Sequence, residues 1–223
     1  MNKKLFFEAI AKYLLGVILI GMLIFLPAGT LKYVNGWIFM GVLFIPMFIA
    51  GVVMMIKDPA LLARRLDAKE KQKEQGIVIK LSGLMFIVGF VLAGLDYRFN
   101  WLQVPRLITY ISAGLFIIGY GLFALVLKQN TYLSRTIKVE ENQKVIDSGL
   151  YGIVRHPMYM ATLLLFLSMP LILGSLVSFF IFLAYPVLIG VRIINEEKVL
   201  ENQLEGYIEY KKKVKYRLIP FIW

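Results

Sequence analysis

Residues 156–191 read HPMYMATLLLFLSMPLILGSLVSFFIFLAYPVLIGV, a run of 36 residues without Asp, Glu, Lys or Arg. Pro170 and the sequence Leu173-Gly174-Ser175 interrupt this run near its middle. Two full membrane spans and a turn would need more than about 40 residues, because each span takes about 20. We therefore predict a tight helical hairpin with arms of about 16–18 residues, or about 25 Å each. Pro186 lies within the second arm and is expected to kink it.

Four uncharged or nearly uncharged segments precede the hairpin, at residues 13–31, 33–56, 76–95 and 107–127. The third carries only Lys80, which lies near one end and can reach the membrane interface. Each segment reaches or approaches the length that a helix needs to cross about 30 Å of hydrocarbon. The sequence therefore predicts an all-α, polytopic membrane helix bundle, with about four spanning helices plus the C-terminal helical hairpin, or six passes.

The composition of the 223 residues agrees with this fold, since 59% are hydrophobic and 17% are charged. Soluble domains have roughly 45–50% apolar residues and about 25% charged residues. The absence of Cys excludes disulfide frameworks and thiol nucleophiles, and a single His excludes multi-His metal sites, so we expect no metal. We interpret the formal net charge of +11 as an orientation signal and expect no nucleic-acid partner.

The Lys and Arg residues orient the predicted helices. If residues 1–12, 57–80, 128–155 and 192–223 lie inside, that side holds 22 of the 25 Lys and Arg residues. Both termini are then predicted to be cytoplasmic. The N-terminal segment has no convincing small-residue cleavage site and a second span follows it, so we interpret it as a retained first helix. In a prokaryotic cell this predicts a multi-pass protein of the plasma (inner) membrane, with its site facing the cytoplasm.

Three segments between or after the spans are predicted to be cytoplasmic. Segment 57–75 alternates apolar and charged residues after Asp58-Pro59, which predicts an amphipathic helix on the membrane surface. Segment 129–154 contains a short β-prone run at residues 136–139. Segment 195–215 is predicted to be helical, with glutamates before lysines, as the helix dipole favours. We expect one integral membrane domain, residues 1–223, whose functional portion is 128–223.

Polar residues gather in three clusters at the predicted cytoplasmic boundary, where they are informative. The clusters are Asn130, Tyr132, Ser134 and Arg135; Gly149, Tyr151, Arg155, His156, Pro157 and Tyr159; and Arg192, Glu196 and Glu197, followed by Tyr207, Tyr210, Arg217 and Pro220. Because a hairpin returns to its starting side, His156 and Tyr159 should face Arg192 and the two glutamates. Arg192 and Glu196 share a helix face. A guanidinium held there by a carboxylate would suit a second carboxylate, such as that of a substrate.

Each of these residues also has a simpler explanation. His156 can be the extended residue before a helix that begins at Pro157. Arg192 can be an interface anchor, the glutamates partners of the helix dipole, and the tyrosines interface residues. Their convergence favours a site. The chain has neither a G-x-G-x-x-G motif after a strand nor a Walker A motif, so a Rossmann or P-loop nucleotide site is excluded. Gly119-Tyr120-Gly121 is interpreted as a helix-packing feature.

The order of these motifs resembles the isoprenylcysteine carboxyl methyltransferase family over roughly residues 128–223. The resemblance rests on GLYGIVRHPMY (149–159), the apolar hairpin, R-x-x-x-E-E (192–197) and YIEYKKKVKYRLIP (207–220). KDPALLARRL (57–66) is similar to a segment of prokaryotic members. One departure is QLEGY (203–207), which is one residue shorter than the usual family pattern. The RHPMY motif alone is shared with phospholipid methyltransferases and sterol reductases.

The resemblance implies a membrane methyltransferase that uses S-adenosyl-L-methionine and takes a lipidic or prenylated methyl acceptor from the bilayer. It places the cofactor at a cytoplasm-facing pocket formed by Tyr151, Arg155, His156, Pro157, Tyr159 and Glu197. It places the acceptor at Arg192, Asn130 and Tyr132. Catalytic roles fall to Arg192, Glu196 and Glu197, with Arg192 holding the acceptor carboxylate and one of the two glutamates meeting the cofactor's amino group or orienting Arg192.

Three alternatives remain open at this point. A phospholipid amine or a thiol could replace the carboxylate as acceptor, and an ammonium acceptor would need a glutamate as base. A sterol-reductase-like oxidoreductase would use NADPH, although no basic cluster dedicated to a 2′-phosphate is evident. A non-enzymatic scaffold or transporter predicts polar residues at the bilayer midplane, where this chain is nearly all apolar.

Overall fold

The computed structural model describes residues 3–67, 73–130, 132–133, 139 and 142–223, and the elements within these ranges are helices. In chain order they are α1 (Lys3–Ala28), α2 (Val34–Lys57), α3 (Pro59–Leu66), α4 (Lys73–Phe99), α5 (Arg106–Gln129), the 3-10 helix η1 (Gly149–Gly152), α6 (Pro157–Ile172), α7 (Leu176–Phe182), α8 (Ala184–Gln203) and α9 (Tyr207–Lys213).

Among the described residues, five helical stretches are long and apolar enough to cross a membrane. They are α1, α2, most of α4, α5, and α7 joined to α8 over Leu176–Gln203. Large apolar side chains remain exposed on their outer faces, among them Leu14, Ile18, Ile45, Ile117 and Val187. This is the surface that a lipid-facing bundle needs. The predicted all-α membrane bundle is confirmed, and the protein is an integral multi-pass membrane protein.

The C-terminal hairpin consists of α6 and the α7–α8 stretch. The 16 residues of α6 rise about 24 Å, so this arm is as short as expected. The turn between the arms contains Gly174, whose φ of +81° is a conformation that favours glycine. The turn is bonded to the loop after α4, because Val104 N–H donates to the Gly174 carbonyl at 3.0 Å and Leu176 N–H to the Leu102 carbonyl at 3.0 Å.

The second arm is interrupted where Pro186 predicts a kink. Helix α7 ends at Phe182 and α8 begins at Ala184. Pro186 has no backbone N–H with which to bond the carbonyl of Phe182, four residues earlier, so the helical ladder is broken at this point.

Aromatic side chains fill the core of the bundle. Phe39, Phe90, Phe116 and Phe182 are buried in it, from α2, α4, α5 and α7. Helices α5 and α6 approach closely at Gly119, where an added Cβ would lie 2.9 Å from Cγ of Leu165. The interpretation of Gly119-Tyr120-Gly121 as a helix-packing feature is therefore confirmed at Gly119, whereas an added Cβ at Gly121 would meet open space.

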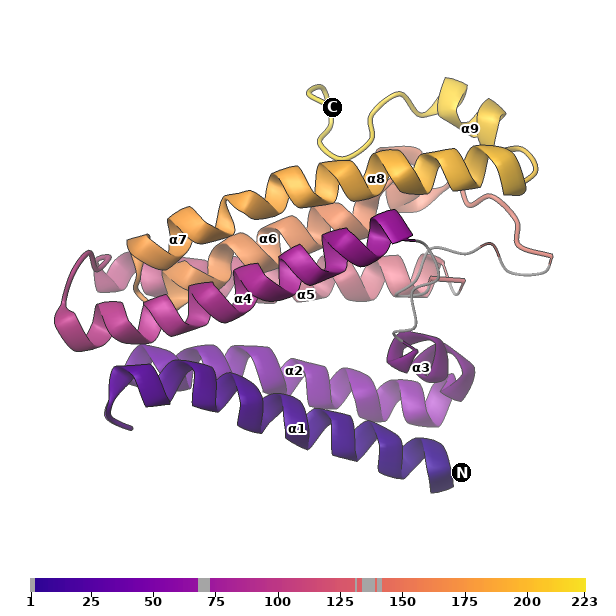
Figure 1. The fold of residues 1–223 in the computed structure, drawn as a ribbon. Coiled ribbons are helices and arrows are strands. Elements are labelled where there is room, and N and C mark those ends of the chain that lie inside the picture. Colours follow the sequence, from indigo (N-terminus) through magenta and orange to yellow (C-terminus); the bar gives the residue numbers. More distant parts are fainter. Residues whose placement is uncertain (1–2, 68–72, 131, 134–138, 140–141) are drawn as a thin grey trace.

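The N-terminus, α3 and α9 lie at one end of the bundle, whereas the segment after α9 turns back over α8 and places the C-terminus above its middle (Figure 1). We call the end with the N-terminus the basic end, because it is the end where the charge pattern places most Lys and Arg residues and which that pattern predicts to be cytoplasmic. The hairpin turn lies at the opposite end. The hairpin thus starts and finishes at the basic end, where α6 begins and α8 ends.

Two predicted cytoplasmic elements differ from the structure. The helix expected over 57–75 is shorter, since α3 ends at Leu66 and residues 68–72 lie outside the described part. The helix expected over 195–215 is split into α8 and α9 at Gly206, which has a φ of +81°. A left-handed glycine ends the helical path and turns α9 back, which alternation of charges alone does not predict. Residues 136–138 of the β-prone run also lie outside the described residues.

Candidate active site

A pocket at the basic end of the bundle collects side chains from four separate segments. We call it the polar pocket; its empty space is about 810 Å³ when the part open to solvent is included. Its lining consists of Asn130, Tyr132 and Leu133 after α5; Gln143, Lys144, Val145 and Ile146; Tyr151, Arg155, His156, Pro157, Met158 and Tyr159 at the start of α6; and Arg192, Glu196, Leu200, Leu204, Tyr207 and Tyr210 from α8 to α9.

The start of α6 is fixed by the C-terminal tail. Pro157 is the first helical residue and His156 the N-cap, but the His156 side chain makes no capping hydrogen bond. Instead the backbone N–H of Arg155 donates to the Tyr216 carbonyl at 2.9 Å and that of His156 to the Arg217 carbonyl at 2.8 Å. The tail therefore holds the Arg-His-Pro sequence at the pocket, and the imidazole is available for a different contact.

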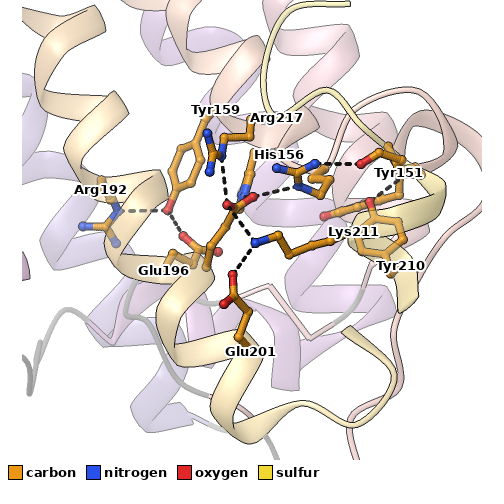
Figure 2. A network of polar contacts seen from close by, with 12 residues as sticks. Tyr151, His156, Tyr159, Arg192, Glu196, Glu201, Tyr210, Lys211 and Arg217 are labelled. Carbon is orange, nitrogen blue, oxygen red and sulfur yellow. Dashed lines mark hydrogen bonds and ion pairs between the residues drawn. The ribbon is translucent and has the colours of Figure 1, made fainter. Parts of the chain in front are cut away.

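That contact is with Glu197, a carboxylate with 2% of its surface exposed. Its Oε1 accepts from Arg155 Nε at 2.7 Å and lies 3.3 Å from His156 Nε2, while its Oε2 accepts from Arg217 Nε at 2.9 Å. In Figure 2 the side chains of His156, Arg217 and Lys211 point toward this carboxylate, with Lys211 Nζ 3.9 Å from Glu197 Oε2. The hydrogen bonds and positive charges around the Glu197 carboxylate offset the free-energy cost of removing it from water. Glu197 thus joins α8 to the start of α6 and to the tail.

A second chain of contacts links Arg192 to Glu196 through Tyr159. Arg192 Nε donates to the Tyr159 hydroxyl oxygen at 2.9 Å, and the Tyr159 hydroxyl donates to Glu196 Oε2 (Figure 2). The Tyr159 ring also packs near His156, with centroids 5.8 Å apart. Arg192 and Glu196 are one turn of α8 apart, as predicted, and the hydroxyl of Tyr159 from α6 lies between their polar groups. The guanidinium is therefore oriented by a phenol that is itself held by a carboxylate.

Hydrogen bonds connect Tyr132 to Asn130 and Asn130 to Tyr151 at the wall of the pocket. The Asn130 side-chain amide donates to the Tyr151 hydroxyl oxygen at 3.1 Å, and its carbonyl accepts from Tyr132 N–H at 3.1 Å. Burial raises the pKa of the Tyr151 hydroxyl above its usual value, so the phenol is neutral at physiological pH. Tyr210 donates to the Tyr151 carbonyl at 2.7 Å, which connects α9 to η1.

A second cavity, the apolar groove, begins beside the polar pocket and runs between α4, α5, α6 and α8. It encloses about 1120 Å³, including space open to its surroundings. Its lining consists of Arg65, Val78, Ile79, Ser82, Gly83, Phe86, Phe123, Met158, Tyr159, Thr162, Phe166, Tyr185, Ile189 and Arg192. Met158, Tyr159 and Arg192 line both cavities. Arg192 is therefore at the boundary between a polar site and a groove lined by membrane helices.

The structure brings most of the predicted site residues together. Asn130, Tyr132, Tyr151, Arg155, His156, Pro157, Tyr159, Arg192 and Glu196 all line the polar pocket, whereas Glu197 lies behind it. Ser134 and Arg135 lie outside the described residues.

Sequence reasoning missed Arg65, which comes from α3 and contacts Met158 Sδ at 3.9 Å and the ring of Phe123 at 5.2 Å. No local signal distinguishes it from the other basic residues of that segment. Sequence reasoning also assigned no role to Tyr207.

The region with this geometry has recognisable relatives. Residues 112–202 match the isoprenylcysteine carboxyl methyltransferase family. The match extends from within α5 to the end of α8 and contains every residue to which the motif resemblance assigns a cofactor, acceptor or catalytic role. The family resemblance expected from the motifs is confirmed for this region.

The chain is also similar to several Delta(14)-sterol reductases. It is 33% identical over 91 residues to one from Mus musculus, covering 40% of this chain and 22% of the mouse protein. It is 28% identical over 137 residues to one from Arabidopsis thaliana, covering 55% and 36% respectively. A third, from Methylotuvimicrobium alcaliphilum, is 29% identical over 93 residues, covering 40% and 22%. The chain thus spans between about a fifth and a third of the length of these relatives, in a region they share with the methyltransferase family.

Proposed function

We propose that this protein is an S-adenosyl-L-methionine-dependent membrane methyltransferase that O-methylates the carboxylate of an isoprenylcysteine-like or other lipidic acceptor. The observation that carries the proposal is the place of Arg192, which lines both the polar pocket and the apolar groove. An enzyme that transfers a group from a polar cofactor to a lipid needs a polar site and an apolar site in contact. It also needs a side chain between the two sites that recognises the acceptor. The family match over residues 112–202 supports the same reaction class.

The lining of the polar pocket fits the cofactor. Glu196 supplies a carboxylate for an ammonium group, and Leu133, Val145, Ile146, Leu200 and Leu204 supply an apolar wall for an adenine ring. Tyr151, His156, Pro157 and Tyr159 would form the opposite wall. Pockets with apolar walls and a few placed polar groups are typical of small-molecule sites. The cofactor would supply an electrophilic methyl group, and a carboxylate O–C bond would form as the C–S bond breaks to leave S-adenosylhomocysteine.

The apolar groove fits the acceptor's lipid chain. Its walls include Val78, Ile79, Phe86, Phe123 and Ile189 from helices long and apolar enough to cross the membrane. An apolar chain placed there would bring its polar head to Arg192, at the end of the groove shared with the polar pocket. The groove's position among spanning helices supports access to the acceptor from the bilayer.

The residues at the boundary suit a carboxylate nucleophile. A carboxylic acid with a pKa near 4 is ionised at pH 7, so the reaction needs no general base. It needs orientation and removal of water, and proximity alone contributes about 7–11 kcal/mol in favourable cases. Arg192 would hold the carboxylate through its planar fork. Tyr159 and Glu196 would fix the orientation of that fork.

The two glutamates receive different roles in this proposal. Glu196 lines the pocket and would meet the cofactor's amino group. Glu197 is bonded to Arg155, His156 and Arg217, and would act as a positioning residue that holds the pocket wall together. Arg155 would support the cofactor site in the same indirect way, since its guanidinium also bonds the carbonyls of Val214 and Lys215.

The first test is calorimetric titration of the detergent-purified protein with S-adenosylhomocysteine. We expect the wild type to bind and His156→Ala to bind much more weakly. Arg192→Ala should abolish methyl transfer to a prenylcysteine analogue while leaving S-adenosylhomocysteine affinity nearly unchanged. Arg106→Ala, an exposed residue at the opposite end of the bundle, is the matched control and should change neither. A folded wild type that does not bind would overturn the proposal.

A phospholipid amine or thiol acceptor is distinguished by the same variants. An ammonium acceptor must lose a proton, so Arg192→Ala would then keep its turnover and Glu196→Gln would lose turnover even at saturating cofactor. Retained activity of Arg192→Ala would favour such an acceptor.

The second candidate function is an NADPH-dependent sterol-reductase-like activity, which the similarity to Delta(14)-sterol reductases favours. Titration with NADPH separates it from the first. NADPH binding without S-adenosylhomocysteine binding would support the reductase, and the reverse would support the methyltransferase.

A further inference from the structure

Tyr207, at the wall of the polar pocket, carries a hydroxyl that has no hydrogen-bond partner among the residues that the structure describes. It is the first residue of α9 and has 4% of its surface exposed. Its Oη atom is buried and bonds none of the described residues, although the side chain lines the pocket. Buried polar side-chain atoms are bonded in the great majority of cases, so such an atom beside a pocket calls for a ligand.

The other buried tyrosines of this pocket differ in this respect. Tyr210 donates to the Tyr151 carbonyl at 2.7 Å, and the Tyr151 hydroxyl oxygen accepts from Asn130 at 3.1 Å. Tyr159 is bonded to both Arg192 and Glu196. These three hydroxyls hold the wall together, whereas the hydroxyl of Tyr207 contributes nothing to it among the described residues. Tyr207 therefore differs from the other three tyrosines in the hydrogen bonding of its hydroxyl, because all four side chains are similarly buried.

The electrostatic surroundings keep the Tyr207 hydroxyl protonated. Burial, followed by the negative charges of Glu197 and Glu196, raises its pKa above the usual value. The hydroxyl is therefore a neutral group that can donate one hydrogen bond and accept others.

We propose that the Tyr207 hydroxyl is a direct hydrogen-bonding contact for the nucleoside cofactor in the polar pocket. This inference rests on the proposed methyltransferase function and adds a residue to its binding site. The bond would form only when the pocket is occupied. The hydroxyl of Tyr207 would then contribute to affinity for the ligand without contributing to the stability of the empty protein.

The test compares Tyr207→Phe with Tyr210→Phe in the full-length, detergent-purified protein. For Tyr207→Phe we expect S-adenosylhomocysteine affinity to fall by about twofold to tenfold, the range of one net hydrogen bond. The melting temperature of the ligand-free variant should equal or exceed that of the wild type, because a buried unpaired hydroxyl is removed. Tyr210→Phe removes an existing bond to Tyr151, so its ligand-free melting temperature should fall.

Three outcomes would overturn the inference. Unchanged S-adenosylhomocysteine affinity in Tyr207→Phe would show that the hydroxyl does not contact the ligand. A lower melting temperature, or failure to fold, would show that the hydroxyl has a structural partner instead. Absence of binding by the wild type would reject the proposed function itself, which distinguishes that failure from the other two.

Discussion

Replacing Glu197 by glutamine should destabilise the protein far more than replacing the adjacent Glu196. The side chains of Glu197 and Arg155 are 3% and 5% exposed, and their ion pair is 2.7 Å long. Removing the carboxylate charge leaves the Arg155 guanidinium buried without its counter-ion. Removing one partner of a buried pair costs about 3–5 kcal/mol. Glutamine keeps one acceptor oxygen, so we expect about 3 kcal/mol for Glu197→Gln, the lower end of that range.

The other cations add little to this cost. Arg217 and Lys211 have side chains that are 32% and 29% exposed, so each can turn toward solvent when the carboxylate is lost. A loss of about 3 kcal/mol in a domain of this size lowers the melting temperature on the order of 10 °C.

The assay is thermal unfolding of each detergent-purified variant, with S-adenosylhomocysteine affinity measured beside it. Glu196→Gln should keep its melting temperature within a few degrees and lose ligand affinity. Glu201→Gln, which removes an exposed pair with Lys211, is the stability control and should cost less than about 1 kcal/mol. The double variant Glu197→Gln with Arg155→Met should lose less stability than the sum of the two single variants, because no unpaired charge is left buried.

One result would refute this reasoning. If Glu197→Gln melts like the wild type but no longer binds S-adenosylhomocysteine, Glu197 contacts the ligand directly and does not serve to hold the wall. The roles assigned to the two glutamates would then be reversed.

Three further predictions concern other parts of the molecule. Arg192→Lys should lower kcat/KM for the lipid acceptor by at least about 100-fold and leave S-adenosylhomocysteine affinity within about twofold of the wild type, because a point charge cannot replace the planar fork of the guanidinium. Steady-state kinetics and calorimetric titration would measure the two effects, and near-normal turnover would contradict the role proposed for Arg192. Gly83→Leu should raise KM for the acceptor by filling the apolar groove, whereas Gly51→Leu on α2, which has equal room for a side chain, should not. Ser175→Ala should lower the melting temperature by removing both the cap of α7 and a bond to the buried Asp96, a loss of about 1–3 kcal/mol, with ligand affinity unchanged at the far end of the bundle.

The sequence alone determined the membrane fold, because its evidence is local. Uncharged segments of helical length predict spans wherever they occur, and a run of 36 uncharged residues with a Leu-Gly-Ser interruption predicts a short hairpin. The location of the site also followed, since a hairpin must return to the side from which it starts. For that reason the order of residues along the chain is enough to place His156 and Tyr159 beside Arg192.

Only the tertiary structure decided which contacts each residue makes within the candidate site. Glu196 and Glu197 are neighbours in sequence, but one residue turns a helix by about 100°, so they face different partners. Glu196 faces Tyr159 and the pocket, whereas Glu197 faces Arg155 and the tail residue Arg217. The orientation of α8 about its own axis depends on the packing of all the helices around it. No local pattern in the sequence contains that information. For the same reason, only the folded chain shows that the buried hydroxyl of Tyr207 bonds none of the described residues.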